Sequence, residues 1–355
     1  MRIETEKILE GIRRITPQRR INIMEVCGTH TVSIAKSGLK ELLPENIRLV
    51  SGPGCPVCVT PQDYIDKAIW LSNQKDIIIT TFGDLMRVPG TTESLSSRRA
   101  SGSDIRVLYS PAQAIDIAKG HSNKIVVFLA VGFETTIPAV SGTLEMALRE
   151  NIKNLTILCA HKTVPIALEV LATSEELNID GFILPGHVST IIGIRPYEFL
   201  AQRYQKGCAI SGFEPEHILE AIFLILNQIV KNEFYIANQY KGTVDYAGNK
   251  RALSSIEKFF EPVDSIWRGI GNIPQSGLRL KKEFAEFDIE TRVDIPELNS
   301  VEPRGCRCGD VLKGLIEPEN CPLFGKVCTY ENPVGACMVS SEGSCAAYYR
   351  YRKRV

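Results

Sequence analysis

The chain has 355 residues, of which 44% are hydrophobic and 23% charged, an ordinary composition for a folded globular protein of two or three domains. Lysine plus arginine equals aspartate plus glutamate at 41 each, so charge gives no reason to expect nucleic acid or a membrane as a partner. The longest apolar runs, Ile125–Val131 and Ala221–Leu226, are too short to span a bilayer. The N-terminal residues read as an amphipathic helix without a signal peptide's apolar core, and we expect a cytoplasmic protein.

Short β-rich runs alternate with helix-period segments from about residue 20 to residue 213. Buried apolar strands separated by helices of this length are typical of a parallel α/β sheet. The predicted strands are Ile21–Val26, Ile47–Val50, Ile77–Thr80, Ile105–Tyr109, Ile125–Val131, Leu155–Cys159, Phe182–Leu184 and Cys208–Ile210. The predicted helices between them are Thr31–Leu43, Gln62–Ser72, Pro111–Lys119, Thr136–Arg149, Val164–Ser174 and Arg195–Gln205.

This alternating stretch is long for one sheet, so we predict two similar parallel-sheet α/β domains, divided near residue 120. The first covers residues 1–120 and includes the N-terminal helix, and the second covers residues 121–239 and is closed by a long helix over Glu214–Asn232. In residues 240–355 the alternation fades and six cysteines follow. Because a small, loop-rich region buries little apolar surface, it needs disulfides or a bound metal to be stable. We predict an irregular C-terminal domain that holds a metal centre.

The turns after the predicted strands carry reactive side chains. In parallel α/β sheets, ligands bind in the crevice beyond the carboxyl ends of the strands. Nearly every one of six successive turns combines glycine with Cys, His, Asp or Glu, which indicates a crevice built for chemistry. These turns are Cys27–Thr31, Ser51–Cys58, Thr81–Asp84, Gly132–Thr136, Ala160–Thr163 and Pro185–Ser189.

The second turn contains a Cys-Pro-Val-Cys pair, Cys55 and Cys58. Pro56 suits the first position of a helix, which places Cys55 at the helix N-terminus, where the partial positive charge favours a thiolate. Cys58 follows one turn later on the same face. Such a pair acts as a reversible dithiol or as two thiolate ligands of a soft metal. Two buried structural cysteines are the alternative.

Cys27 adds a third thiol, which can approach this pair if the first two strands are neighbours. His30 nearby is either a neighbour of the helix cap or a donor that orients a thiolate. Glu134 and Asp84 are either helix-capping carboxylates, the commoner role at a strand–helix turn, or groups that handle protons.

His161 and His187 are further candidates at strand ends. Nucleotide motifs are absent: Gly52-Pro53-Gly54 begins like a dinucleotide fingerprint, but Val57 stands where the third glycine belongs, and no phosphate-binding loop motif occurs. The sequence therefore gives no support for an enzyme that uses ATP or NAD.

The six C-terminal cysteines lack the paired Cys-x-x-Cys spacing of a structural zinc site. A [4Fe-4S] cluster needs four thiolates and tolerates irregular spacing, and two cysteines would remain as a redox-active dithiol. We therefore predict an iron–sulfur cluster, with zinc or disulfides as the alternatives. The six are Cys306, Cys308, Cys321, Cys328, Cys337 and Cys345.

Together these residues resemble the HypD family, maturation proteins that help to build the Fe(CN)2CO unit of [NiFe]-hydrogenases. The likeness covers nearly the whole chain, and its motifs are long and unusual. The matching segments are Glu25–His30, Gly52–Cys58, Thr81–Gly90, Gly132–Thr136, Pro185–Ser189 and Gly335–Gly343.

The resemblance implies two similar α/β domains and a third domain that holds a [4Fe-4S] cluster. The family's pattern of four cysteines, with 14, 6 and 16 intervening residues, selects Cys306, Cys321, Cys328 and Cys345. Cys308 and Cys337 then correspond to a redox-active pair near the cluster. The family's iron-binding cysteines fall on Cys27, Cys55 and Cys58.

The resemblance also implies partners: HypC, which shares the iron, and HypE, which delivers cyanide after HypF has charged it. On this basis we expect a redox-active assembly scaffold that binds iron as the Fe(CN)2CO precursor. Electrons would come from a transient external donor and pass through the cluster and the Cys308/Cys337 pair towards Cys55 and Cys58. Cys27 would anchor the iron, while His30, Glu134 and Asp84 would manage protons and hydrogen bonds.

Two other interpretations stay open. The chain could be a stand-alone iron–sulfur thiol–disulfide oxidoreductase, or a zinc-stabilised interaction module without turnover. Iron with bound cyanide and carbonyl separates the assembly scaffold from the oxidoreductase, because only the scaffold would carry it. Colour separates the zinc-stabilised module from both, because a zinc protein is colourless whereas a [4Fe-4S] centre absorbs near about 400 nm.

Overall fold

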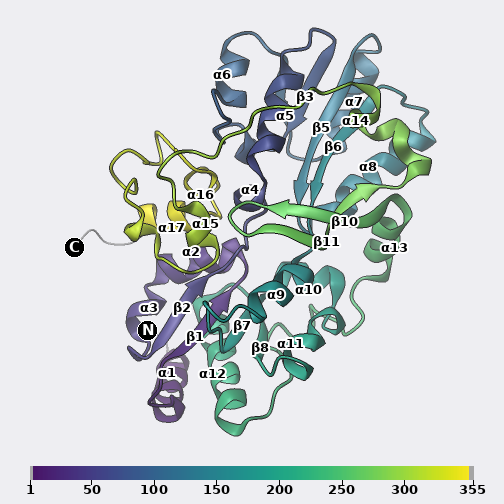
Figure 1. Cartoon of the computed structure of the whole chain (residues 1–355). Coiled ribbons are helices and arrows are strands. Elements are labelled where there is room, and N and C mark those ends of the chain that lie inside the picture. The colour runs from purple at the N-terminus through teal and green to yellow at the C-terminus, as the bar shows by residue number, and fades with distance from the viewer. Residues whose placement is uncertain (1–2, 352–355) are drawn as a thin grey trace.

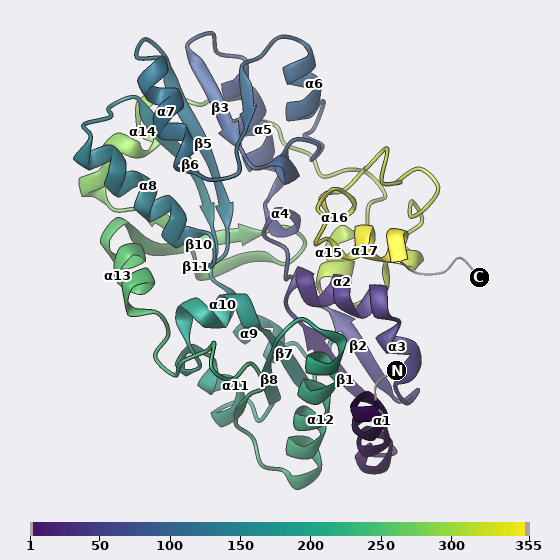
Figure 2. The same cartoon turned by 180° about the vertical axis from the view of Figure 1, so that it is seen from behind.

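The computed structural model describes residues 3–351. Its two sheets form the cores of two lobes, and a β-hairpin crosses between them (Figure 1). Seen from behind, the C-terminal segment lies to one side, next to α2 (Gly28–Ser37) and α4 (Pro56–Val59) (Figure 2). The fold is therefore an α/β fold with two parallel sheets, as predicted.

Sheet A has five parallel strands in the order β2-β1-β7-β8-β9. The strands are β1 (Ile21–Glu25), β2 (Ile47–Ser51), β7 (Gly181–Pro185), β8 (Gly207–Ser211) and β9 (Ile236–Asn238). Almost every residue of the three central strands is buried, because helices cover both faces. This accounts for their mostly apolar sequence.

Sheet B has four parallel strands in the order β4-β3-β5-β6. The strands are β3 (Ile77–Thr81), β4 (Ile105–Val107), β5 (Ile125–Gly132) and β6 (Leu155–His161). All eight predicted strands are present. Their pairing differs from the sequential division near residue 120, since sheet A combines strands from before and after the whole of sheet B.

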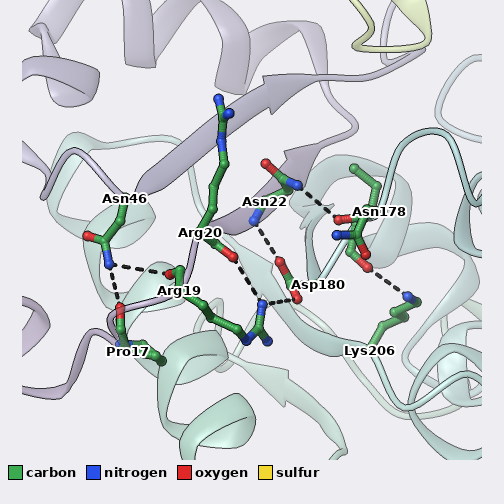
Figure 3. A network of polar contacts seen from close by, with 9 residues as sticks. Pro17, Arg19, Arg20, Asn22, Asn46, Asn178, Asp180 and Lys206 are labelled. Carbon is green, nitrogen blue, oxygen red and sulfur yellow. Dashed lines mark hydrogen bonds and ion pairs between the residues drawn. The ribbon is translucent and has the colours of Figure 1, made fainter.

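A polar network explains how the late strand β7 reaches the early strand β1 (Figure 3). The Asp180 carboxylate accepts a hydrogen bond from the Asn22 amide nitrogen at 2.8 Å. It also forms an ion pair with Arg19 at 2.7 Å. The Asn22 side chain in turn donates to the carbonyl oxygen of Asn178. These contacts join segments that are more than 150 residues apart and fix the register of the two strands.

Helices pack on both sheets. The amphipathic helix α1 at the N-terminus lies against α12, which is the predicted long helix. The predicted helix over Thr31–Leu43 is instead two helices, because Gly38 adopts a left-handed conformation with φ of 66° that ends α2. The helices of the two lobes are α1 (Ile3–Ile15), α2 (Gly28–Ser37), α3 (Leu39–Leu42), α4 (Pro56–Val59), α5 (Gln62–Ser72), η1 (Gly83–Leu85), α6 (Leu95–Ala100), α7 (Gln113–Gly120), α8 (Ile137–Arg149), α9 (Val164–Ala172), α10 (Gly186–Ile192), η2 (Arg195–Tyr197), α11 (Glu198–Gln202) and α12 (Pro215–Lys231).

Beyond residue 240 the chain forms a helix, a long antiparallel hairpin and a loop-rich segment. The hairpin of β10 and β11, which the sequence did not predict, reaches from sheet B to α4 (Figures 1 and 2). Within residues 3–351, no helix is long and apolar enough to cross a membrane. The elements of this region are α13 (Lys250–Phe259), β10 (Phe260–Trp267), β11 (Gly271–Leu280), η3 (Lys282–Phe287), α14 (Ile289–Arg292), α15 (Cys308–Leu312), η4 (Pro318–Asn320), α16 (Ala336–Val339) and α17 (Ser344–Tyr351).

Candidate functional site

Cys27 lies at the carboxyl end of β1 and forms the N-cap of α2. Its amide nitrogen donates a hydrogen bond of 3.1 Å to the Glu25 carboxylate, which also accepts from the Thr31 hydroxyl at 2.5 Å. The thiol is buried, and burial, followed by the negative charge of Glu342, raises its pKa to about 12. Free Cys27 therefore keeps its proton at neutral pH, and a metal that binds the sulfur must displace that proton.

Cys55 and Cys58 flank Pro56 on the short helix α4, as predicted. Cys55 is the N-cap, its sulfur accepts a hydrogen bond from the Cys58 amide nitrogen at 3.2 Å, and the two cysteines form a disulfide with Cα atoms 5.3 Å apart. Both side chains are buried. The pair can thus form the closed state of the reversible dithiol that the sequence suggested.

The Cys27 turn and the turn that leads to Cys55 lie side by side. Strands β1 and β2 are neighbours, with Glu25 opposite Ser51. Beyond them, the Gly28 amide nitrogen donates to the Gly54 carbonyl oxygen at 3.1 Å. Because Gly54 has no side chain, its backbone lies directly against that of Cys27. The predicted approach of Cys27 to the Cys55/Cys58 pair requires the first two strands to be neighbours. This adjacency is confirmed.

His30 is completely buried in α2, and its Nε2–H donates to the Gly212 carbonyl oxygen at 2.9 Å. Burial lowers its pKa to about 4, so the ring is neutral. The ring lies against Phe213, on which His187 also stacks. The His30 ring therefore ties α2 to the turn after β8, while the backbone N–H of His30 hydrogen-bonds to the Cys27 sulfur.

Glu134 accepts a hydrogen bond of 2.9 Å from the amide nitrogen of Val164, the first residue of α9. Its second oxygen, Oε2, is buried without a hydrogen-bond partner among residues 3–351. Burial raises its pKa to about 7. The buried phenol of Tyr197, which sequence reasoning missed, has both Glu134 and Cys27 as electrostatic neighbours. Tyr197 thereby connects the turn after β5 to the Cys27 turn.

One carboxyl group, Glu342, meets the Cys27 turn from the C-terminal segment, and a second, Asp84, contacts that same segment. Asp84 accepts a hydrogen bond from the Ser340 side chain, and burial raises its pKa. Glu342 accepts from the Thr29 hydroxyl at 2.9 Å, and burial raises its pKa as well. Glu342 was not predicted as a site residue, because only the fold brings the C-terminal segment onto the turn after β1.

Two other residues of this region depart from, or add to, the expectations. His161 lies on the side of the hairpin, where its ring packs against Phe260 and its Nδ1 is 3.7 Å from the Cys159 sulfur.

Glu25 is buried below Cys27, and burial raises its pKa to about 8. It also lines a cavity of about 630 Å³ between α2, β2 and α17. Sequence reasoning did not select Glu25 as a site residue, because it lies within a predicted strand and not in the turn that follows.

All six C-terminal cysteines line one pocket. Cys306 has Cys321 and Cys345 as electrostatic neighbours, and so does Cys328. The Cys337 thiol hydrogen-bonds to those of Cys308 and Cys345. Gly335 leaves room for the pocket, because a β-carbon there would lie 2.7 Å from the Cys306 sulfur.

Across the described residues, no three or more Cys, His, Asp or Glu side chains are arranged around a single metal ion. A cubane cluster asks for a different arrangement, since each of its four irons takes one thiolate and the cysteines surround the cluster rather than one ion. Cys306, Cys321, Cys328 and Cys345 face one pocket of the required chemistry. Four thiols around one pocket are the kind of donor set that a [4Fe-4S] cluster uses.

The C-terminal cysteine region packs on the Cys55–Cys58 helix. Helices α15, which begins at Cys308, and α16, which contains Cys337, both contact α4. The four cysteines share one buried cluster of side chains. In both views the C-terminal segment lies beside α2 and α4 (Figures 1 and 2). The two cysteine pairs are thus on neighbouring helices.

A protein that gathers three cysteines at the ends of parallel strands, beside a pocket lined by six more, belongs to the broad class of cysteine-rich α/β proteins. Comparison with known proteins makes the class specific. The chain matches the family described as "HypD: Hydrogenase formation hypA family" over residues 4–352. The chain belongs to the HypD family of hydrogenase maturation factors.

Several known proteins are similar to this chain over most of its length. Hydrogenase maturation factor HypD2 of Bradyrhizobium diazoefficiens is 44% identical over 343 residues, covering 94% of this chain and 90% of the relative. HypD of Cupriavidus necator is 43% identical, with 94% and 90% covered. A putative hydrogenase expression/formation protein of Methanocaldococcus jannaschii is 42% identical, with 98% and 97% covered. A solved structure of the type III effector XopQ with ADP-ribose aligns at 10% identity with a TM-score of 0.14, which is too low to inform the fold.

Proposed function

We propose that this chain is the scaffold on which iron receives its cyanide and carbonyl ligands for [NiFe]-hydrogenase, bound by Cys27, Cys55 and Cys58. The observation that carries the proposal is the contact of Gly54 with Cys27, which sets one buried thiol beside a Cys-x-x-Cys pair. Thiolates are soft donors suited to low-spin iron. Iron is here the cargo, and the neighbouring thiols are its binding site.

Iron binding requires that the Cys55–Cys58 disulfide opens, because a disulfide sulfur has no thiolate charge to offer. Two electrons and two protons convert it to the dithiol. Cys308 and Cys337, whose thiols hydrogen-bond to one another on helices that pack against α4, are the proposed source of these electrons. In the transfer, the Cys308/Cys337 dithiol becomes a disulfide and the Cys55/Cys58 disulfide becomes a dithiol.

The four remaining cysteines of the pocket, Cys306, Cys321, Cys328 and Cys345, are the proposed holders of a [4Fe-4S] cluster. When bound, such a cluster supplies electrons one at a time at a low potential. Cys337 also hydrogen-bonds to Cys345, so the proposed pair lies next to a proposed ligand. A transient external donor would restore the electrons that the pair gives up.

Carboxyl groups near Cys27 are the proposed proton carriers. Glu134 has a pKa of about 7 and one unpartnered oxygen, so it can hold a proton at neutral pH and release it. Glu342, at the same turn, and Asp84, its electrostatic neighbour, both have raised pKa values. His30 is fixed as a neutral ring against Gly212 and would orient α2 rather than move protons.

A maturation factor acts with other maturation proteins. We propose that HypC shares the iron with Cys27 and that HypE, charged by HypF, brings cyanide to it. A second function, stand-alone disulfide reduction, is favoured by one observation, the closed Cys55–Cys58 pair beside the C-terminal cysteines. Both cysteines of that pair are nearly inaccessible, with exposures of 3% and 0%, which disfavours an external disulfide substrate.

The test is the metal content of the full chain, purified without oxygen together with HypC. We expect absorbance near about 400 nm and about five irons per chain, four in the cluster and one as cargo. Cys27→Ala should lower the iron to about four and leave the absorbance unchanged. Zinc in a colourless protein, or the same iron content in Cys27→Ala, would refute the proposal.

A further inference from the structure

The turn of the β10–β11 hairpin is wedged between the two helices that carry the cysteine pairs. On one side, the Arg268 amide nitrogen donates to the Val59 carbonyl oxygen and its Nε–H to the Thr60 carbonyl oxygen, both at 2.8 Å. Val59 is the last residue of α4 and Thr60 its C-cap. The last carbonyl groups of a helix have no hydrogen-bond donor within the helix. Arg268 supplies donors to the carbonyl groups at the C-terminal end of the Cys55–Cys58 helix.

On the other side, the next residue of the turn reaches the Cys308 helix. Gly269, with φ of 76°, packs directly against Gly309, and a β-carbon on Gly269 would lie 3.0 Å from the Gly309 carbonyl carbon. Cys308 immediately precedes Gly309, and the positive charge of Arg268 acts on the Cys308 sulfur. One turn of the hairpin therefore contacts the ends of both helices.

The Arg268 side chain is only 3% exposed, an unusual position for a guanidinium. Its one carboxylate partner, Glu302 at 3.0 Å, is itself 55% exposed, and its Nη2 has no hydrogen-bond partner in the part of the chain that the structure describes. A buried cation that is only partly paired is costly unless nearby dipoles or negative charge compensate it. Here the carbonyl end of α4 and the sulfur of Cys308 supply that compensation.

We propose that Arg268 is a positioning residue that holds the Cys55–Cys58 helix and the Cys308 helix at the spacing needed for disulfide exchange between the two pairs. This inference rests on the proposed function. In the exchange, a sulfur of the Cys308/Cys337 dithiol attacks the Cys55–Cys58 disulfide and forms a mixed disulfide. The second sulfur then resolves it. Two electrons and two protons pass from one pair to the other, and no other reactant is consumed.

Exchange is measured in the full, cluster-reconstituted chain with the Cys55–Cys58 disulfide closed. Dithionite starts the reaction, alkylation stops it at set times, and mass spectrometry gives the fraction of each pair that is open. We expect Arg268→Gln to slow opening of Cys55–Cys58 by about tenfold or more, the effect of a 1.4 kcal/mol change. Arg268→Lys, which keeps the charge but cannot contact both Thr60 and Glu302, should slow it less.

The matched control is Arg279→Gln on the same hairpin, because Arg279 is exposed and its one ion pair within residues 3–351 is with Glu261. Its rate should stay within about twofold of the parent's, and all variants should keep the absorbance near about 400 nm. A parental rate in Arg268→Gln overturns the inference. If that variant does not fold, a parental rate in Arg268→Lys does so.

A double variant, Cys308→Ser with Cys337→Ser, separates the inference from the proposed function on which it rests. If Cys55–Cys58 opens at the parental rate in this variant, the exchange route itself is wrong. If opening is slow in this variant but parental in Arg268→Gln, the route stands and only the role of Arg268 is wrong.

Discussion

Gly54 lies directly against Cys27: a β-carbon at Gly54 would be 2.6 Å from the Cα atom of Cys27. Gly54→Ala must therefore push the two turns apart, whereas Gly142→Ala, where a β-carbon meets nothing within 4 Å, serves as the control. We expect Gly54→Ala to cost about 1–3 kcal/mol of stability, typical of overpacking. It should also lower the cargo iron by more than half at unchanged 400 nm absorbance. Normal cargo iron in this variant would show that the contact is dispensable.

Glu134→Gln should separate proton handling from structure. A glutamine oxygen can still accept the hydrogen bond from Val164, so the fold should survive. The folded-state pKa of Glu134, about 7, exceeds the value of 4.5 expected when unfolded, so its ionisation destabilises the fold as pH rises through this range. The neutral glutamine should then increase the free energy of unfolding by about 1–3 kcal/mol at pH 8, with little change at pH 5.

The same Glu134→Gln variant should lose hydrogenase maturation in cells that depend on this chain. Urea unfolding at both pH values and a hydrogenase assay are the measurements. A variant that is stabilised and still fully active would remove Glu134 from proton transfer while leaving its place in the structure intact.

His161 should stay neutral well below the usual range for histidine. Burial lowers its pKa to about 3, so the unfolded chain takes up a proton below about pH 6.5 that the folded chain does not. Its contribution to stability is constant above pH 6.5 and falls by about 1.4 kcal/mol for each pH unit below it. NMR titration of the five histidines should find both His30 and His161 among those that do not titrate between pH 5 and 8, and the signal that is absent in His161→Gln identifies the latter. Titration of that signal near pH 6.5 would contradict its burial.

Asp180 should stabilise the pairing of β1 with β7. Its carboxylate is largely buried and accepts from the Asn22 amide nitrogen and from Arg19 (Figure 3). Asp180→Ala leaves that amide without its partner and should cost about 1–3 kcal/mol in urea unfolding. Removing an exposed pair by Glu261→Ala should cost less than about 1 kcal/mol. Equal effects of the two changes would mean that the network of Figure 3 does not hold the strands together.

The sequence predicted the strands and most helices, because continuous apolar runs bounded by glycine-containing turns identify buried parallel strands. It did not predict which strands pair. The strands β1 and β7 are both fully buried and their apolar residues do not specify a partner, while the contacts of Asn22 with Asp180 arise only once the chain has folded. A division of the strands in sequence order was therefore the natural expectation, and it missed the return of the chain to sheet A.

The candidate site shows the same limit. Cys27, Cys55 and Cys58 could be found from residue type and spacing, since thiols at strand ends are rare and chemically distinctive. Glu342 and Arg268 could not, because neither lies at a strand end of the two sheets. Each reaches its neighbours through contacts with residues more than 200 positions away.

The central claim is that Cys27 binds the iron that carries cyanide and carbonyl. Infrared spectroscopy of the chain, purified with HypC in the absence of oxygen, tests it most directly, since the stretching bands of metal-bound cyanide and carbonyl lie apart from those of protein. We expect these bands in the parent and in Gly142→Ala, and their loss in Cys27→Ala. Identical bands in Cys27→Ala would place the iron elsewhere and contradict the account.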